Sequence, residues 1–262
     1  MFKAKKSLGQ NFLIDNEIIS RIIETININQ KNILEIGPGK GALTSKILEK
    51  NPKKLIVVEK DDYLAKQLKT KFLSKINIIC NDVLKIDENQ IDDEKLIVFG
   101  NLPYNISTEI LCKWILNINQ NNVWFSHLIL MFQKEVADRI IATPNTKNYG
   151  RLSIISNWKL NIKKLFDVKP QSFLPVPKID STVLYFEPKQ DFYKIKKGDN
   201  LEKITRLFFA HRRKMIKKPY KNLFNGNMEV ANKLNIDLNL RPQNLNFETY
   251  YKLAREYEYL KS

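Results

Sequence analysis

The chain has 262 residues, enough for one large domain or for a large and a small one, each with its own core. Lys and Arg number 44 against 28 for Asp and Glu, and the formal net charge of +16 favours a polyanionic partner such as nucleic acid. The counts of two cysteines and two histidines argue against a disulfide framework and against a zinc site, so we expect no metal.

Neither a membrane segment nor a leader is expected. The longest apolar run, around residues 128–132, is far shorter than a bilayer span, and the first residues lack the apolar core of a signal peptide. The sequence therefore predicts a cytoplasmic protein without a membrane partner. Nothing in it suggests an obligate interface, so a monomer is expected.

Residues 3–13 form a basic arm that also carries small and amide residues, ahead of a helix that Asp15 or Asn16 could cap. Such an arm could cover a ligand and touch phosphate. A solvated N-terminal tail is the commoner case, and the residues alone favour it.

A β-branched strand at residues 32–36 runs into Gly37, Gly39 and Gly41 and then into a helix. Glycines at this position let the backbone turn sharply and approach a ligand beside a helix N-terminus. The spacing is close to the dinucleotide fingerprint, so a nicotinamide-dependent dehydrogenase stays open at this point. Glu35 argues against it, because a carboxylate there would repel a pyrophosphate but suit the cationic methionine end of S-adenosylmethionine.

Two further strands end in carboxylates. Glu59 closes the strand that starts at residue 54, at a position where a carboxylate can bind both ribose hydroxyls of an adenosine. Its alternative role is to cap the next helix. Asp82 closes the strand from residue 76 and could accept from an adenine amine while Val83 packs on the ring.

A fourth strand ends in Asn101-Leu102-Pro103-Tyr104. The Asn101 side-chain oxygen and the Leu102 carbonyl could hold the amine of a target adenine with its lone pair toward a methyl donor. Pro103 would stiffen this backbone, and Tyr104 would offer a stacking face. Taken alone, these residues could equally form a type I turn with proline second. Their place after the glycine loop, Glu59 and Asp82 favours catalysis.

Alternating strands and helices up to a last strand at residues 181–188 predict a doubly wound, mostly parallel Rossmann-like sheet. We therefore expect a methyltransferase domain over residues 1–189 and a small all-helical domain over residues 190–262. Residues 189–262 hold 17 basic and 8 acidic residues, over half of the net charge. The predicted RNA-binding cations are Arg212, Arg213, Lys214, Lys217 and Lys218.

Several segments, in order, resemble the rRNA adenine dimethyltransferases, and most closely their bacterial small-subunit (16S) branch. They are 9–13 (Gly-Gln-Asn-Phe-Leu), 35–41, Glu59, 81–82, 101–107 (Asn-Leu-Pro-Tyr-Asn-Ile-Ser), 133–137 and 173–181. The resemblance covers most of the first 190 residues. In the tail, Phe209-Ala-His-Arg-Arg-Lys is similar to that branch but has Ala-His where the family has Asn-Gln.

The resemblance implies an S-adenosylmethionine-dependent enzyme that dimethylates two adjacent adenosines in a hairpin near the 3′ end of 16S rRNA, in the immature small subunit. Loss of such an enzyme is associated with kasugamycin resistance. It also implies that Asn11 and Leu13 contact the cofactor, so that the arm is a lid, and that Phe173 is a second stacking ring opposite Tyr104. The alternatives are a large-subunit rRNA methyltransferase and a non-catalytic ribosome-assembly or RNA-binding factor of the same fold.

Overall fold

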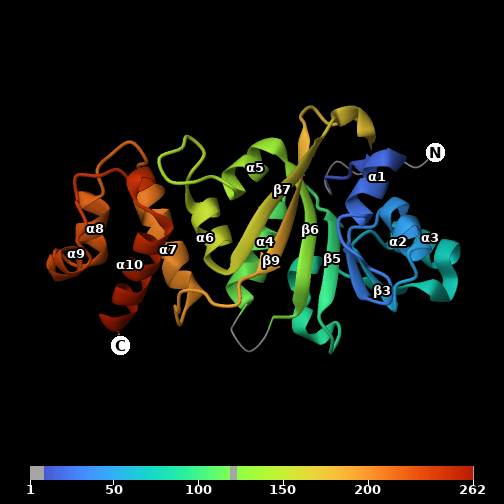
Figure 1. The fold of residues 1–262 in the computed structure, drawn as a ribbon, viewed down its shortest axis with the longest axis horizontal. Coiled ribbons are helices and arrows are strands. Elements are labelled where there is room, and N and C mark those ends of the chain that lie inside the picture. Colours follow the sequence, from blue (N-terminus) through green and yellow to red (C-terminus); the bar gives the residue numbers. More distant parts are fainter. Residues whose placement is uncertain (1–8, 119–122, 262) are drawn as a thin grey trace. The chain divides into compact units, whose positions relative to one another are not determined.

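The computed structural model describes residues 9–118 and 123–261 (Figure 1). The chain forms two compact units. The first comprises residues 1–113, 118–137 and 162–188, and the second comprises residues 114–117, 138–161 and 189–262. The second unit therefore contains the predicted C-terminal helical segment and also residues 114–117 and 138–161, which the sequence assigns to the methyltransferase domain.

The first unit is built on a seven-stranded sheet in the order β4-β3-β2-β5-β6-β9-β7 (Figure 1). Its strands are β2 (Asn32–Ile36), β3 (Lys54–Glu59), β4 (Asn77–Cys80), β5 (Leu96–Asn101), β6 (Phe125–Gln133), β7 (Leu160–Val168) and β9 (Ser181–Pro188). Strands β2 to β6 pair in parallel, and β9 runs antiparallel to β6. This is the expected Rossmann-like arrangement.

Helices α2 (Ala42–Glu49), α3 (Asp62–Phe72) and α4 (Ser107–Asn117) connect successive parallel strands. Helix α1 (Asn16–Ile23) precedes β2, and α5 (Lys134–Ile140) follows β6. Asp15 caps α1, because its carboxylate accepts from the backbone N–H groups of Glu17 and Ile18. Short 3-10 turns are η2 (Leu73–Lys75), η3 (Val83–Lys85), η4 (Glu88–Gln90), η5 (Pro170–Ser172) and η6 (Pro242–Asn244).

The central strands β2, β3 and β5 are buried on both faces, as in other parallel sheets. Alternate strand residues such as Ile33, Val57 and Phe99 form one core cluster with the apolar sides of α1, α2 and α3. The residues between them, such as Leu34 and Val98, are equally buried on the opposite face. The sheet is therefore a rigid platform whose strand ends hold their positions.

The strand order reverses between β2 and β5. The chain builds β2, β3 and β4 outward in one direction, and then returns to place β5 on the other side of β2. In open α/β sheets, ligands bind beyond the carboxyl ends of the strands at such a switch point. Glu35, Glu59, Asp82 and Asn101 all lie at this edge.

Two features were not predicted. Residues 160–168 form β7, although four of these residues are polar or charged, because an edge strand can expose such side chains. A second, two-stranded sheet joins β1 (Phe12–Leu13) to β8 (Phe173–Leu174) across more than 150 residues of chain. Neither strand is long enough to show a periodic pattern.

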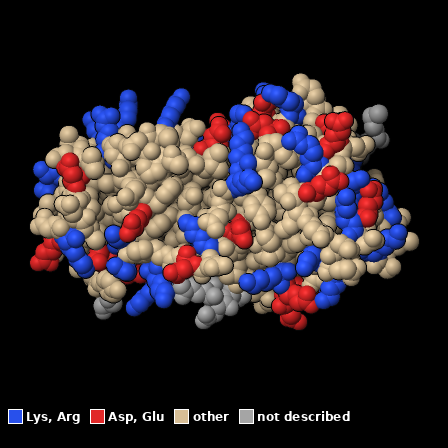
Figure 2. All heavy atoms as spheres, in the orientation of Figure 1, with Lys and Arg blue, Asp and Glu red and all other residues tan. Residues whose placement is uncertain are grey.

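The second unit contains α6 (Arg151–Lys159), α7 (Gly198–Phe209), α8 (Lys217–Leu223), α9 (Glu229–Lys233) and α10 (Phe247–Tyr259). Its core is aromatic: the Tyr149 ring contacts Phe209 and Phe247 edge to face, and Phe208 contacts Tyr250 in the same way. Figure 2 shows Lys and Arg side chains projecting over the helices drawn in orange and red in Figure 1.

Among the residues that the structure describes, every helix is too short or too polar to cross a bilayer.

Candidate active site

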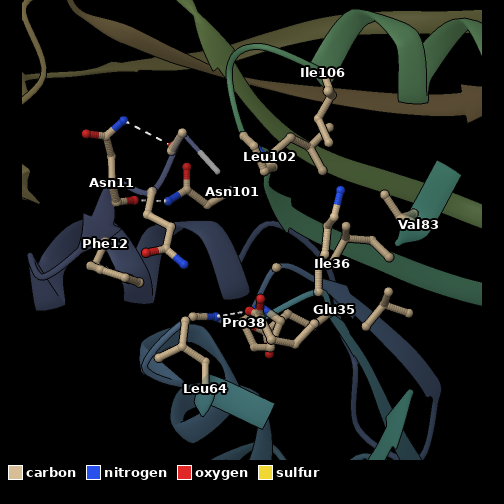
Figure 3. A pocket seen from close by; sticks show the side chains of 18 of the residues that line it. Asn11, Phe12, Glu35, Ile36, Pro38, Leu64, Val83, Asn101, Leu102 and Ile106 are labelled. Carbon is tan, nitrogen blue, oxygen red and sulfur yellow. Dashed lines mark hydrogen bonds between the residues drawn. The ribbon is translucent and has the colours of Figure 1, made fainter. Parts of the chain in front are cut away.

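A pocket opens at the switch point of the sheet (Figure 3). All nine residues predicted to bind the cofactor line it: Asn11, Leu13, Glu35, Gly37, Gly39, Glu59, Asp82, Val83 and Asn101. So do Leu102, Pro103 and Tyr104. Further lining comes from residues that sequence reasoning did not single out, including Phe12, Lys60 and Ile106, which had no signal apart from their neighbours in the chain.

The glycine loop needs its glycines for conformation and for space. Gly37 and Gly39 have φ angles of 66° and 57°, in the left-handed region that other residues avoid. A Cβ on Gly39 would come within 2.8 Å of the Phe12 ring, so the arm packs directly on the loop. A Cβ on Gly37 would meet nothing closer than 3.9 Å, so the backbone there is open to the pocket.

Glu35 is a buried carboxyl group with one unsatisfied oxygen. Oε2 accepts from the Thr44 hydroxyl at 2.6 Å, whereas Oε1 has no hydrogen-bond partner among the described residues. Burial raises the pKa of Glu35 to about 7, with a smaller contribution from the negative charge of Glu59. Such a group favours a cationic ligand, which would stabilise the charged form.

Glu59 is tied to the backbone around it. Its Oε2 accepts from the Gly39 N–H at 3.1 Å, and its Oε1 accepts from the Asp61 N–H at 2.9 Å. Burial raises its pKa, and these hydrogen bonds oppose the shift. Asp61 rather than Glu59 caps α3, through the Tyr63 N–H at 3.0 Å. The helix-cap alternative for Glu59 is therefore wrong, and the carboxylate is held at the pocket wall.

Asp82 is the third carboxylate that lines the pocket. Its Oδ1 accepts from the Leu84 N–H at 3.0 Å, and its Oδ2 forms an ion pair with Lys60 Nζ at 2.7 Å. The hydrogen bond from Lys60 lowers the pKa of Asp82, so this carboxylate is an acceptor at neutral pH. Val83 is buried beside it.

The N-terminal arm closes one side of the pocket. Phe12 and Leu13 pair antiparallel with Leu174 and Phe173, and both arm side chains are buried. The Asn101 side-chain Nδ2 donates to the backbone carbonyl of Asn11 at 2.9 Å (Figure 3). From Gly9 onward the arm is thus part of the pocket wall, and the interpretation as a solvated tail is wrong for these residues. Residues 3–8 lie outside the described part of the chain.

Asn101-Leu102-Pro103-Tyr104 leaves the sheet at the mouth of the pocket. Asn101 is the last residue of β5, and Leu102 is buried. The Ile106 N–H donates to the Pro103 carbonyl at 3.1 Å, so proline is first rather than second in the turn that leads to α4. The Tyr104 hydroxyl lies 2.6 Å from Ser181 Oγ.

Phe173 is not brought to the pocket. Its side chain is fully buried in the core cluster of the first unit, and the residue pairs with Leu13 of the arm. In this conformation the ring offers no face to a base opposite Tyr104. Sequence reasoning could not see this, because the burial arises from the β1–β8 pairing.

The predicted RNA-binding cations lie between α7 and α8 and in the first turn of α8. Arg213, Lys214, Lys217 and Lys218 are exposed. Arg212 differs: it is half-buried, and its Nη2 donates to the Thr146 carbonyl at 2.9 Å.

Comparison with known proteins gives one consistent family. Residues 1–259 match the ribosomal RNA adenine dimethylase family. The chain is 63% identical to ribosomal RNA small subunit methyltransferase A of Pelagibacter ubique (strain HTCC1062), over 99% of this chain and 98% of the relative. It is 42% identical to the protein of that name in Wolbachia sp. subsp. Drosophila simulans (strain wRi), over 99% and 96% of the two chains.

Two solved structures share the fold. A dimethyladenosine transferase from Plasmodium falciparum superposes with a TM-score of 0.79 at 27% identity, covering 95% of this chain and 98% of the other. The 23S rRNA methyltransferase ErmE gives 0.67 at 22% identity, covering 96% and 100%, which shows the fold alone. The chain therefore belongs to the ribosomal RNA adenine dimethylase family, enzymes that methylate ribosomal RNA with S-adenosylmethionine as methyl donor.

Proposed function

We propose that the pocket binds S-adenosylmethionine in an extended form along the strand ends. Glu35 and the glycine loop would hold the methionine end, Glu59 the ribose hydroxyls, and Asp82 with Val83 the adenine. The unsatisfied Glu35 Oε1 and the nearby Glu59 and Asp82 carboxylates support this assignment, since they suit a cationic ligand and disfavour a pyrophosphate. When bound, this group supplies a methyl carried on a positively charged sulfur, which makes it an electrophile.

The chain's own contribution to methyl transfer is to position the amine of the target adenine. A backbone carbonyl can only accept a hydrogen bond, so the group of Asn101 that faces the Asn11 carbonyl must be the amide nitrogen, Nδ2. The Asn101 Oδ1 is thereby left as the acceptor for an amine hydrogen, and the Leu102 carbonyl would accept the second. Two acceptors on one amine direct its lone pair away from the ring plane, and no strong base is required.

Tyr104 and Pro103 would complete the target-base site. The half-buried Tyr104 ring lines the pocket and can stack on the base, which is worth ~1–3 kcal/mol in single-strand binders. Pro103 lacks an N–H and restricts the backbone beside the Leu102 carbonyl. Phe173 is buried in the core and does not line the pocket, so we assign the stacking to Tyr104.

We further propose that the substrate is a pair of adjacent adenosines in a hairpin near the 3′ end of 16S rRNA, dimethylated in the immature small subunit by a cytoplasmic monomer. The small-subunit name of the relatives that are 63% and 42% identical supports this choice over large-subunit RNA. The exposed cations at Arg213, Lys214, Lys217 and Lys218 support contact with an RNA backbone.

The observation that carries the proposal is the hydrogen bond from Asn101 Nδ2 to the Asn11 carbonyl, which leaves the Asn101 oxygen as the accepting end of the amide. The test is to incubate the protein with tritiated S-adenosylmethionine and unmethylated small subunits, free 16S rRNA or unmethylated large subunits. We expect dimethyladenosine at two adjacent positions of 16S rRNA by mass spectrometry of nuclease fragments. Label confined to large-subunit RNA would contradict the small-subunit assignment, and no label in any adenosine would contradict the function of the pocket.

A ribosome-assembly role is the second candidate, favoured by the separate unit with its exposed cations. Cells that carry only Asn101→Ala provide its test. Full restoration of small-subunit maturation by this variant would mean that maturation requires binding and not methylation. Accumulation of immature particles would mean that maturation requires methylation.

A further inference from the structure

The Tyr104 ring is held at its far end by a residue from a distant strand. The Tyr104 hydroxyl and Ser181 Oγ are 2.6 Å apart, a short hydrogen bond in which either oxygen can donate. Tyr104 follows β5 by three residues, and Ser181 is the first residue of β9. In the sheet, β6 lies between these two strands. The hydrogen bond therefore joins the segment after β5 to the start of β9, past the carboxyl end of β6.

The length of this crossing explains why a tyrosine is needed. Neighbouring strands are ~4.8 Å apart, so β5 and β9 are separated by roughly 10 Å. A phenol is long enough to bridge most of that gap and still end in a hydrogen-bonding group, whereas phenylalanine would end in an apolar edge. Burial raises the pKa of Tyr104, so its hydroxyl stays protonated at neutral pH.

The anchor at the other end is fixed. Ser181 is fully buried, and it pairs in register with Gln133 of β6. The ring of Tyr104 is thus restrained at the backbone beside Pro103 and at its hydroxyl, which leaves little freedom for the torsions between. Its face toward the pocket is set before any substrate arrives.

We propose that Ser181 is a positioning residue for methyl transfer, which holds the Tyr104 ring as a preformed stacking face for the target adenine. The inference rests on the proposed function of the pocket. A stacking platform that is already ordered spares the substrate the entropy of ordering it. Ser181 itself touches neither the base nor the cofactor in this assignment, and it acts only through the Tyr104 hydroxyl.

A double-mutant cycle with unmethylated small subunits as substrate tests this. Ser181→Ala and Tyr104→Phe each remove one partner and keep the ring. Each should lower kcat/KM for the subunit about 2- to 10-fold, the range for one net hydrogen bond, and should leave the dissociation constant of S-adenosylmethionine unchanged. The double variant should be no worse than the poorer single variant, because both remove the same bond. Additive losses, or a Ser181→Ala enzyme equal to the wild type, would overturn the proposal.

Ser156→Ala is the matched control. Ser156 is another fully buried serine, and its hydroxyl has no hydrogen-bond partner within residues 9–118 and 123–261. Its loss should not change kcat/KM. If Ser156→Ala slows the reaction as much as Ser181→Ala, the effect is one of general packing, and the positioning role is refuted.

A readout independent of methyl transfer separates this inference from the proposed function. In protein labelled with 3-fluorotyrosine, the Tyr104 signal is the ¹⁹F resonance that is missing from Tyr104→Phe. Ser181→Ala should shift that resonance and change its width, while Ser156→Ala should not. An unmoved resonance refutes the tether even in an active enzyme. A moved resonance in a protein that methylates no adenosine upholds the tether and refutes the function.

Discussion

The two units of the chain differ in what their interiors hold. In the first unit, charged groups point inward: Glu35 and Glu59 are almost fully buried, and both face the pocket. In the second unit, the interior is aromatic, and seven of the ten tyrosines of the chain belong to it. Some of their hydroxyls donate to backbone carbonyls, as Tyr250 does to Pro242 at 2.7 Å and Tyr251 to Ile154 at 3.0 Å. The buried hydroxyls of Tyr149 and Tyr193 have no hydrogen-bond partner among the described residues.

This contrast suggests a division of roles, with methyl transfer in the first unit and RNA binding on the surface of the second. A buried carboxylate costs folding free energy unless it is paired, as Glu88 is with Lys113 and Glu256 with Lys233. Glu35 has an oxygen without a hydrogen-bond partner among the described residues, which points to a ligand site. An aromatic core stabilises a small unit and leaves its surface free to carry cations. Changes in the pocket should therefore affect cofactor affinity and turnover, and changes on the surface of the second unit should affect RNA affinity and its salt dependence.

The largest effect is expected for Asn101→Ala. The substitution removes the acceptor for the amine hydrogen, an electrostatic contact of the kind whose loss costs about 10²–10³ in kcat. It also removes the hydrogen bond to the Asn11 carbonyl, so the affinity for S-adenosylmethionine should fall by only a few-fold. Single-turnover kinetics with labelled cofactor measure the rate of methyl transfer, and calorimetry measures the affinity for S-adenosylmethionine.

Asn89→Ala is the control for this variant, because Asn89 lies in an exposed turn away from the pocket. Its kcat should equal that of the wild type. An Asn101→Ala enzyme that keeps more than a tenth of the wild-type kcat would show that the asparagine is not the acceptor.

Glu59→Gln should weaken S-adenosylmethionine binding about 10- to 100-fold, the range for hydrogen bonds to a charged group. The amide has one acceptor oxygen, whereas both carboxylate oxygens accept backbone N–H groups, from Gly39 and Asp61. One N–H would therefore face an NH₂ group. Calorimetric titration gives the affinity. The exposed Glu94→Gln serves as comparison and should bind normally, and unchanged binding by Glu59→Gln would rule out the ribose assignment.

Glu35 predicts a pH dependence of cofactor binding. Its pKa is about 7 in the ligand-free protein, and a cationic ligand prefers the ionised form. Affinity for S-adenosylmethionine should therefore rise about tenfold per pH unit below pH 7 and level off above it. Glu35→Gln should bind more weakly at pH 8 and should lose this slope. A slope that survives in Glu35→Gln would assign the titration to another group.

The same residue should affect stability with the opposite sign. The folded pKa of about 7 lies above the ordinary value of 4.5, so the stabilising contribution is complete below about pH 4.5 and is lost as pH rises through 7. At pH 8 the ionised carboxylate costs on the order of 3 kcal/mol. The ligand-free Glu35→Gln protein should thus melt at a higher temperature than the wild type at pH 8, and the gap should be much smaller at pH 5. An equal gap at both pH values would mean that the ionisation of Glu35 does not affect folding.

The pocket could be predicted from the sequence because each strand end carries a residue whose type alone indicates its chemical role. Gly37, Glu59, Asp82 and Asn101 follow apolar runs, and parallel strands bring such ends together. Sequence reasoning missed what depends on contacts far apart in the chain: the pairing of Leu13 with Phe173, and the bond from Tyr104 to Ser181. Residue order alone carries no signal for these contacts.

The smallest effects are expected on the surface of the second unit, where the cations are individually replaceable. Arg213→Ala with Lys214→Ala removes two exposed charges, and the slope of log affinity for RNA against log salt should become shallower by about 1–2 if both contact phosphate. S-adenosylmethionine affinity should not change. Filter binding across a salt series measures the slope, and an unchanged slope would make these residues an ordinary solvated surface.

Arg212→Ala tests whether Arg212 contacts RNA phosphate or serves a structural role within the second unit. Arg212 is half-buried and donates to the Thr146 carbonyl, so its charge already serves a contact within the second unit. Its loss should lower stability by about 1 kcal/mol and should change the salt slope less than either exposed neighbour does. Equal slopes for Arg212→Ala and Arg213→Ala would mean that RNA draws Arg212 away from Thr146. In that case RNA binding would use a residue that also stabilises the second unit, and the interior of this unit and its RNA-binding surface would not be separate.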